Sequence, residues 1–245
     1  KLTFVTITLQ LLQEIMASPH TVITRGSTYD NRLNLPESFY SQIVSRYAGT
    51  TLGRQEIYAE MLTESPGALW KRSMFLRRPA PELVRILVGI DPAVTSTEDS
   101  DETGIVVAGR GIDGNYYVMA DRSGRFSPDT WARRAIQCYH EFKGDRIIAE
   151  ANNGGEMVSL TLKTVDRTVP VKLVHASRGK QARAEPVVAL YEQGKVFHVG
   201  EFGELEDQLC TWSPEDGASP DRLDALVWTL SELMNKQDYG VRFLG

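Results

Sequence analysis

Three strands are predicted one after another in the second part of the chain, and this succession constrains the fold more than any other feature. They cover residues 83–90, 104–108 and 116–120, which are rich in apolar and β-branched side chains. Asp113-Gly114 supplies a hairpin turn between the last two strands. No helix is predicted within this stretch, so the sheet begins with three consecutive strands.

Helices and strands alternate from residue 127 onward. Ser127 as N-cap, Pro128 in the first helical position and Asp129 in the first turn predict a helix that reaches about Phe142. The later elements are a strand at 146–149, a helix through residues 157–162, a strand at 169–174, a helix at 184–193 and a last helix that begins at 219–221. This order is that of the ribonuclease H-like fold, an α/β fold in which helices flank a mixed central sheet.

Residues 1–81 have a different character. A strand-like run at 2–7 and a helical pattern at 9–16 are followed by polar, turn-rich sequence and a second helical pattern at 39–47. An opening strand without an earlier partner indicates the cut end of a larger domain. Pro66-Gly67 and the prolines within 77–81 predict a linker. We therefore expect a mostly helical part at 1–81 and an α/β domain at 82–245.

Composition agrees with a globular protein that has no membrane association. The 245 residues are 42% hydrophobic and 24% charged, which is enough to bury a core. The net charge of -5 argues against indiscriminate binding to nucleic acid, although residues 71–85 and 171–184 contain basic clusters. Cys138 and Cys210 lack metal-binding spacing, which favours a reducing compartment. No signal peptide is evident, and the apolar run at 83–90 is too short to span a bilayer.

Three separated acids lie where a strand ends or a helix begins. Asp91 follows Val-Gly-Ile, Glu150 follows Ile-Ile-Ala, and Asp224 lies within an apolar helix. In the fold inferred above, Asp91 belongs to the central strand and Glu150 to the adjacent parallel strand. Two divalent ions held roughly 4 Å apart can hydrolyse a phosphodiester bond when carboxylates converge from several elements. Because carboxylate oxygens suit Mg²⁺ and Mn²⁺, we expect these three residues to bind two such ions.

A fourth acidic ligand is less well defined. At about 100° per residue, Asp224 lies on the flank of the apolar stripe of the last helix, where a carboxylate can point into a site. Asp221 is three residues earlier and only about 60° away around the helix, so it can reach the same cation. Asp101 precedes the second strand and can approach Asp91, but a surface turn is the simpler interpretation.

Each acid also has a plainer interpretation. Asp91 precedes a proline, as turn residues commonly do, and Glu150 precedes Asn-Asn-Gly-Gly, which is typical of a solvated loop. Asp221 is a common type of residue for a helix start. Asp224 is harder to explain in this way because it lies inside a strongly apolar helix. The combination of the acids is more specific than any one of them.

Basic residues near position 180 are candidates for phosphate contacts. Arg178, Lys180 and Arg183 lie in a stretch without acids, so they either position DNA or form a solvated loop.

Four blocks in this order resemble the large terminase subunit of tailed bacteriophages and related prophage elements. The blocks are Val-Gly-Ile-Asp-Pro-Ala at 88–93, Asp-Glu-Thr-Gly-Ile-Val-Val at 101–107, Ile-Ala-Glu-Ala-Asn-Asn-Gly-Gly at 148–155 and Ser-Pro-Asp-Arg-Leu-Asp-Ala-Leu at 219–226. Residues 24–31 and 53–56 are also similar to the end of the family's packaging ATPase domain.

The resemblance implies an RNase H-like endonuclease that cuts concatemeric double-stranded viral DNA when capsid filling starts and ends. Asp91, Glu150 and Asp224 match the family's metal-binding acids. The family's partners would be the small terminase subunit and the capsid portal, in a homo-oligomeric ring at the procapsid in the host cytoplasm. The family's ATP-binding P-loop is missing from this sequence. Residues 1–81 therefore resemble the tail of the ATPase domain, and no ATP hydrolysis is expected from this chain.

Three alternatives remain open at this point. A RuvC-like junction resolvase would use the same chemistry on a four-way junction. A motor or docking module that does not cut DNA would retain the acids without catalysis. A sugar-kinase-like ATPase could use Gly89-Ile90-Asp91 in a phosphate loop, although no second glycine-rich phosphate motif is found.

Overall fold

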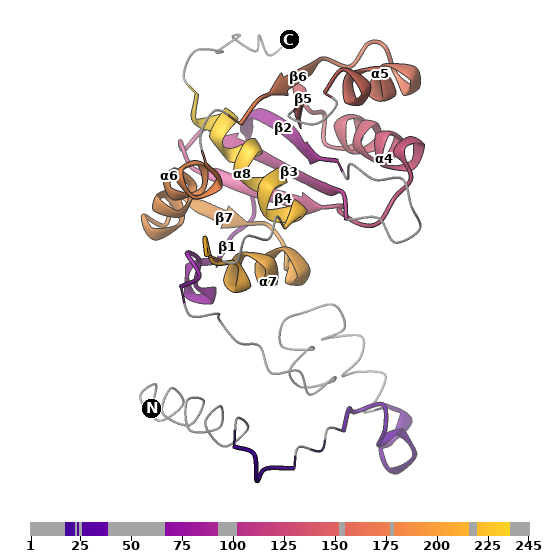
Figure 1. Ribbon diagram of the computed structural model, residues 1–245, viewed down its shortest axis with the longest axis vertical. Helices are drawn as coiled ribbons and strands as arrows, with labels where there is room; N and C mark the ends of the chain where they lie inside the picture. The colour runs from indigo at the N-terminus through magenta and orange to yellow at the C-terminus, as the bar shows by residue number, and fades with distance from the viewer. Residues whose placement is uncertain are drawn as a thin grey trace. The chain divides into compact units, whose positions relative to one another are not determined.

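The structure is a computed structural model that describes residues 18–38 except 23 and 25, together with 67–92, 102–151, 155–176, 179–215 and 220–235 (Figure 1). Contacts divide the chain into two units, residues 1–62 and 63–245. In the first unit, a 3-10 turn covers Arg32–Asn34. The strand expected at 2–7 and the helices expected at 9–16 and 39–47 lie outside the described residues.

In the described part of the second unit, seven strands form a mixed sheet with the order β1-β7-β4-β3-β2-β5-β6. The strands are β1 (Leu76–Arg77), β2 (Leu83–Asp91), β3 (Gly104–Gly111), β4 (Tyr116–Asp121), β5 (Arg146–Glu150), β6 (Val171–Val174) and β7 (Val196–His198). Strands β2, β3 and β4 pair antiparallel, and the predicted turn at Asp113-Gly114 joins the last two. The remaining pairs are parallel. The mixed sheet agrees with the fold class expected from the order of elements.

Helices cover both faces of this sheet. They are α4 (Pro128–Glu141), α5 (Gly155–Val165), α6 (Lys180–Glu192), α7 (Gly203–Thr211) and α8 (Asp221–Met234). The start of α4 is as predicted, since the Ser127 side chain accepts a hydrogen bond from the Thr130 amide. The sequence did not predict β1, β7 or α7, and it placed the start of α6 at Ala184, four residues too late.

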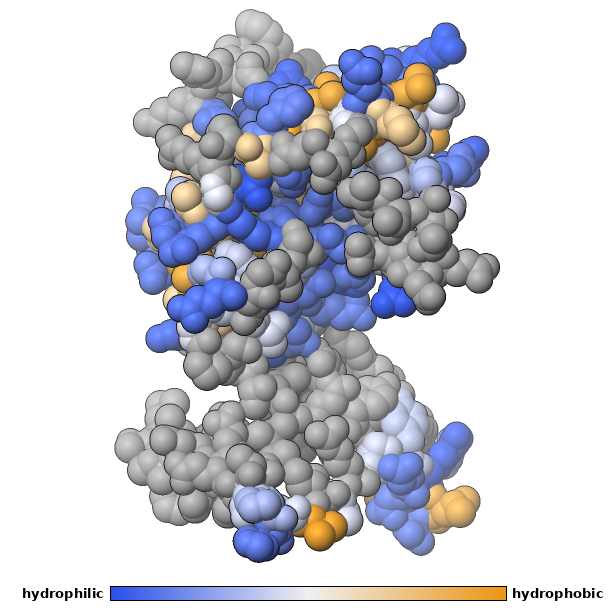
Figure 2. Space-filling model, in the orientation of Figure 1, coloured by the Kyte–Doolittle hydropathy of each residue, from blue (hydrophilic) through white to orange (hydrophobic). Residues whose placement is uncertain are grey.

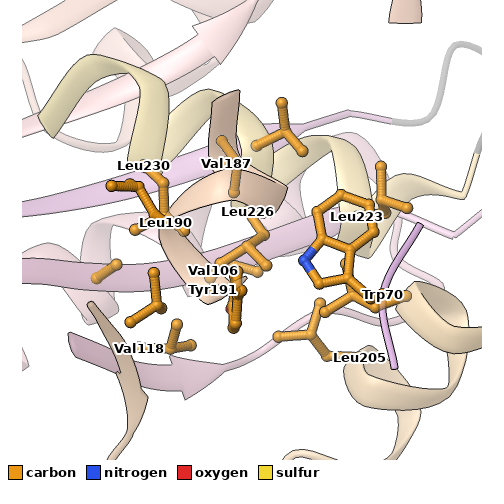
Figure 3. Packing of buried hydrophobic residues seen from close by; sticks show 14 of the residues in the cluster. Trp70, Val106, Val118, Val187, Leu190, Tyr191, Leu205, Leu223, Leu226 and Leu230 are labelled. Carbon is orange, nitrogen blue, oxygen red and sulfur yellow. The ribbon is translucent and has the colours of Figure 1, made fainter. Parts of the chain in front are cut away.

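Alternation along the central strands produces two separate cores. Leu87 of β2 faces a cluster formed with α6, α7 and α8, whereas its neighbours Ile86 and Val88 face α4 and α5. Figure 3 shows the first cluster, in which Leu223, Leu226 and Leu230 of α8 meet side chains from β3, β4 and α6. Because α8 lies between the sheet and α6 and α7, side chains around most of its circumference are buried. This burial is wider than the single apolar stripe expected from the sequence.

The segment expected to be a linker packs against the sheet from Trp70 to Arg77. Trp70 is fully buried and Phe75 is 7% exposed, and both belong to the core on the α8 side. Arg72 forms an ion pair with Asp207. Strand β1 pairs with β7 at the edge of the sheet. The prolines at 79 and 81 therefore follow an edge strand, and buried side chains that belong to the core of the sheet precede them.

None of the described helices combines the length and apolar character needed to cross a bilayer. Apolar side chains gather over α5 in Figure 2, where Met157 and Leu160 are 72% and 63% exposed.

Candidate active site

Two of the acids lie at the ends of neighbouring strands. Asp91 is the last residue of β2 and Glu150 is the last residue of β5. These strands pair in parallel, with Ile90 opposite Ala149, so both carboxylates lie at the same edge of the sheet. This arrangement follows directly from the predicted order of strands.

Helix α8 brings Asp224 to the same place. It crosses β2 and β3, as Figure 1 shows, and Asp224 is 3% exposed. A side chain at Gly89 would prevent this packing, because a Cβ atom there would lie 1.8 Å from Thr229 Oγ1 and 2.6 Å from the Ala225 carbonyl oxygen. Glycine in the middle of β2 therefore lets the helix carrying Asp224 lie close to the strand carrying Asp91.

The charge of the cluster acts on Asp91. Burial, together with the carboxylates of Asp224, Glu150 and Asp221, raises the pKa of Asp91 to about 8, and Lys180 opposes part of this shift. A carboxyl group responds in this way when several other acids lie near it. Asp221, in the first turn of α8, therefore belongs to the same electrostatic cluster as the three main acids.

Helix α6 places two cations against these acids. Lys180 Nζ lies 2.6 Å from Asp224 Oδ2. Arg183 lies between two acids, with Nη1 3.7 Å from Glu150 Oε1 and Nη2 3.9 Å from Asp224 Oδ1. Because α6 begins at Lys180, both cations lie in its first turn, next to the proposed site. The sequence singled out these two residues for phosphate binding but did not predict their contact with the acids.

Trp228 is a site residue that was not among the candidates chosen from the sequence. Its Nε1 donates a hydrogen bond to Glu150 Oε2 over 2.7 Å, and the Arg183 guanidinium lies 4.5 Å from the centre of its ring. Trp228 follows Asp224 by four residues and therefore shares its side of α8. That spacing was the available signal in the sequence.

Two candidates cannot be placed. Asp101 and Arg178 lie outside the described residues. The structure therefore brings together Asp91, Glu150, Asp221, Asp224, Lys180 and Arg183 from the set chosen by sequence.

The donor set has the chemistry of a site for a divalent cation. Its acidic side chains supply carboxylate oxygens, which hard divalent cations prefer, and their mutual repulsion contributes to the raised pKa of Asp91. Within the described part of the chain, no three Asp, Glu, His or Cys residues are arranged closely enough to hold a metal ion. Lys180 and Arg183 contact two of the acids instead. The residues fit a metal by type and charge, while the side-chain arrangement is one in which protein cations neutralise the acids.

The family model of the terminase RNaseH-like domain matches residues 88–233. The matched region is more than half of the chain and includes all four described acids. The chain belongs to this family. It contains a nuclease domain of the type found in terminase large subunits. A comparison with curated proteins found no match.

Solved structures of similar fold include terminase nucleases. The large terminase nuclease of thermophilic phage G20c is 11% identical, with a TM-score of 0.52, over 68% of this chain and 99% of that one. The same nuclease with bound magnesium is 12% identical, with a TM-score of 0.52, over 69% of this chain and 98% of that one. RuvC of T. thermophilus with a Holliday junction substrate has a TM-score of 0.34 at 20% identity, over 60% of this chain and 91% of that one. The G20c matches confirm the RNase H-like fold of this terminase domain.

Proposed function

We propose that this terminase domain is an endonuclease that uses divalent metal ions to cut concatemeric double-stranded viral DNA during genome packaging. The observation that carries the proposal is the convergence of Asp91, Glu150 and Asp224 from two parallel strands and one helix. The G20c terminase nuclease has been solved with bound magnesium, zinc and cobalt, which supports a divalent metal in this family member.

Each acid has a defined part in the proposed site. Asp91 ends β2, which pairs with β5 and packs against α8, and it would bridge or anchor the ions, while Glu150 and Asp224 would supply further ligands. Asp221 is the alternative or additional ligand in the first turn of α8, and Asp101 is the less favoured one. When bound, two divalent ions would polarise the attacking water and stabilise the leaving oxygen. We assign Mg²⁺ or Mn²⁺ because hard cations favour carboxylate oxygen.

The cations of α6 provide a way to bind the scissile phosphate. Lys180 and Arg183 already lie beside the acids, and their positive charges suit the non-bridging oxygens of a phosphodiester. Arg178 would extend this contact along the DNA backbone. Contacts of this kind position a duplex without reading its sequence, so we expect little sequence preference.

The wider assembly is proposed from the family resemblance. The small terminase subunit and the portal would select where the domain acts, within a homo-oligomeric ring at the procapsid in the host cytoplasm. Residues 1–81 would include the end of the packaging ATPase domain. We expect no ATP hydrolysis from this sequence, which contains no P-loop.

A plasmid-cleavage assay tests the nuclease site. Supercoiled plasmid is incubated with the protein in EDTA, Mg²⁺ or Mn²⁺, and the same series is run with Asp91→Asn, Glu150→Gln and Asp224→Asn. We expect metal-dependent cutting that falls by at least about 100-fold in each variant, because each removes a charged ligand. Asp129→Asn, on an exposed acid of α4, is the matched control and retains activity.

Other outcomes separate the competing functions. Preferential cutting of a four-way junction over linear duplex would favour a RuvC-like resolvase. Plasmid that stays intact in both metals would favour a docking module. Undiminished cutting by all three site variants would refute the assignment of the acids.

A further inference from the structure

A cluster of ion pairs surrounds the buried guanidinium of Arg222 in the first turn of α8, the turn that also carries Asp221 and Asp224 of the proposed metal site. Arg222 stands between Asp221 and Asp224 in the sequence and is 7% exposed. Its Nη1 donates to Asp121 Oδ2 over 2.5 Å and its Nε donates to Glu102 Oε2 over 2.8 Å. Its Nη2 also forms an ion pair with Glu204. One guanidinium therefore joins the first turn of α8 to three acids on separate parts of the fold.

The three acids come from elements that surround the start of α8. Glu102 immediately precedes the isolated bridge residue Thr103 and strand β3, Asp121 ends β4, and Glu204 lies in the first turn of α7. The Asp121 side chain is only 6% exposed, so its charge depends on a partner within the protein. A planar guanidinium with five N–H donors can serve several carboxylates at once, whereas the ammonium of lysine acts as a single point charge.

Gln208 of α7 holds the same turn through its backbone. The N-cap residue Pro220 provides no side-chain cap for α8. Gln208 Oε1 instead accepts from the amides of Arg222 over 3.1 Å and Leu223 over 3.4 Å. Gln208 Nε2 donates to Glu102 Oε2 over 3.1 Å, which links this cap to the arginine cluster. The open amides of the helix start are thus satisfied from a neighbouring helix.

Close packing against β3 completes the restraint. A Cβ atom at Gly104 would lie 2.0 Å from the carbonyl oxygen of Asp221 and 3.0 Å from Ala225 Cβ. Only glycine allows the first turn of α8 to approach the start of β3 this closely. The backbone of Asp221 is therefore held by β3 on one side and by the contacts of Arg222 and Gln208 on the other.

We infer that Arg222 is a positioning residue, which fixes the first turn of α8 so that Asp221 and Asp224 face Asp91 and Glu150. Its side-chain contacts with Glu102, Asp121 and Glu204 are to acids outside that proposed ligand set, so Arg222 acts on the metal site through the helical turn that carries Asp221 and Asp224. The inference rests on the proposed function, because it takes Asp221 and Asp224 as ligands. It also predicts an effect on the backbone that needs no metal.

Arg222→Lys tests the inference because it keeps the charge and removes the planar fork. Arg85→Lys is the matched control, since Arg85 contacts Glu232 at 3.5 Å near the other end of α8 and is similarly buried. Three quantities are measured for both variants and the unaltered protein. They are Mn²⁺ affinity by calorimetry, amide exchange at 221–224, and plasmid cleavage.

We expect Arg222→Lys to weaken Mn²⁺ binding by about 10-fold to 100-fold, as loss of a residue supporting metal ligands commonly does. We expect faster exchange at 221–224 in the same variant. Arg85→Lys should leave both values unchanged. Should Arg222→Lys fail to fold, Glu102→Gln is used instead, because it weakens one ion pair of the arginine. We expect weaker Mn²⁺ binding and faster exchange at 221–224 in that variant too. Binding and exchange equal to those of the control in the folded variant would overturn the inference.

The design separates the two hypotheses. Unaltered protein that neither binds Mn²⁺ nor cuts DNA would count against the proposed function alone. Faster exchange at 221–224 in Arg222→Lys, but not in Arg85→Lys, would still support the fixing of this turn. Normal metal-dependent cutting by the unaltered protein, together with unchanged binding and exchange in Arg222→Lys, would reject the role of Arg222 alone.

Discussion

At the scale of single residues, Asp91 is the group whose chemistry the fold changes most clearly. It lies at the end of a buried strand, and the acids around it add to the effect of burial. Both effects favour its neutral form. A divalent cation would favour the charged form, so metal binding and proton release at Asp91 are coupled in the proposed site.

The raised pKa of Asp91 predicts how stability depends on pH. The folded value of about 8 lies above the ordinary value of 3.8, so this carboxyl group favours the folded state at low pH. This contribution to the free energy of unfolding is lost as the pH rises from 3.8 to about 8. In EDTA, Asp91→Asn should therefore melt higher than the unaltered protein at pH 9, by about 2–4 °C or more. The gain should vanish near pH 4, where both side chains are neutral.

Thermal melts across this pH range provide the measurement. Asp129→Asn is the control, because hydrogen bonding to Arg133 lowers the pKa of this exposed acid. It should show no gain in melting temperature as the pH rises. The assignment fails if Asp91→Asn is no more stable than the unaltered protein at pH 9.

At the scale of elements, α6 explains why protein cations reach the acids. The helix begins at Lys180 after Gly179, which provides no side-chain cap. Cations in the first turn oppose the helix dipole. Their contacts with Asp224 and Glu150 compensate for this, so the start of α6 depends on α8 and β5. A local sequence pattern contains no sign of these long-range ion pairs, and the start was therefore predicted four residues too late.

Whether other features could be predicted from the sequence also depends on whether local sequence or distant contacts determine them. The proximity of Asp91 and Glu150 could be predicted, because it follows from the parallel pairing of β2 with β5, which the order of elements indicated. Strand β7 has three residues and β1 has two, too few for a pattern of alternation. The burial of Asp224 was underestimated because helical angles describe one covered face, whereas α8 is covered by the sheet and by other helices.

Lys180 should compete with the metal for Asp224. Removing it in Lys180→Met leaves the buried Asp224 less well compensated, so we expect a loss of about 1–3 kcal/mol in stability without metal. Mn²⁺ should then restore more stability than it adds to the unaltered protein, because no ammonium has to be displaced. A tenfold gain in affinity corresponds to about 1.4 kcal/mol.

Thermal shifts with and without Mn²⁺ measure this competition. Lys172→Met is the matched control, since Lys172 contacts Glu232 over 2.7 Å near the far end of α8. The increment produced by Mn²⁺ should be unchanged in the control. Equal increments in the two variants would exclude competition at Asp224.

At the scale of the whole molecule, the boundary of the α/β unit decides which part is stable alone. Contacts place this boundary after Leu62, and the buried side chains of Trp70 and Phe75 lie well before residue 82. Trp70 contacts Tyr191 with ring centroids 6.3 Å apart, and Phe75 stacks on His198 at 5.1 Å. The α/β unit therefore includes much of the segment expected to be a linker.

Two shortened chains test the boundary. A chain of residues 63–245 should keep the full hydrophobic core, whereas 82–245 loses Trp70, Phe75 and β1. We expect the shorter chain to be less stable by at least about 3 kcal/mol, since truncating one buried aromatic side chain already costs this much. Urea unfolding compares the two chains directly. Equal midpoints and slopes would show that residues 63–81 add nothing to the core.

The edge position of β1 has a mechanical consequence. Tension along the chain from the preceding unit would load the buried side chains of Trp70 and Phe75, the ion pairs of Arg72 with Asp207 and Arg77 with Glu206, and the parallel pair of β1 and β7. Strands β4 and β3 lie between this pair and β2, the strand that carries Asp91. A pull on the chain is therefore borne by one edge of the sheet, while the acids lie beyond the middle of it.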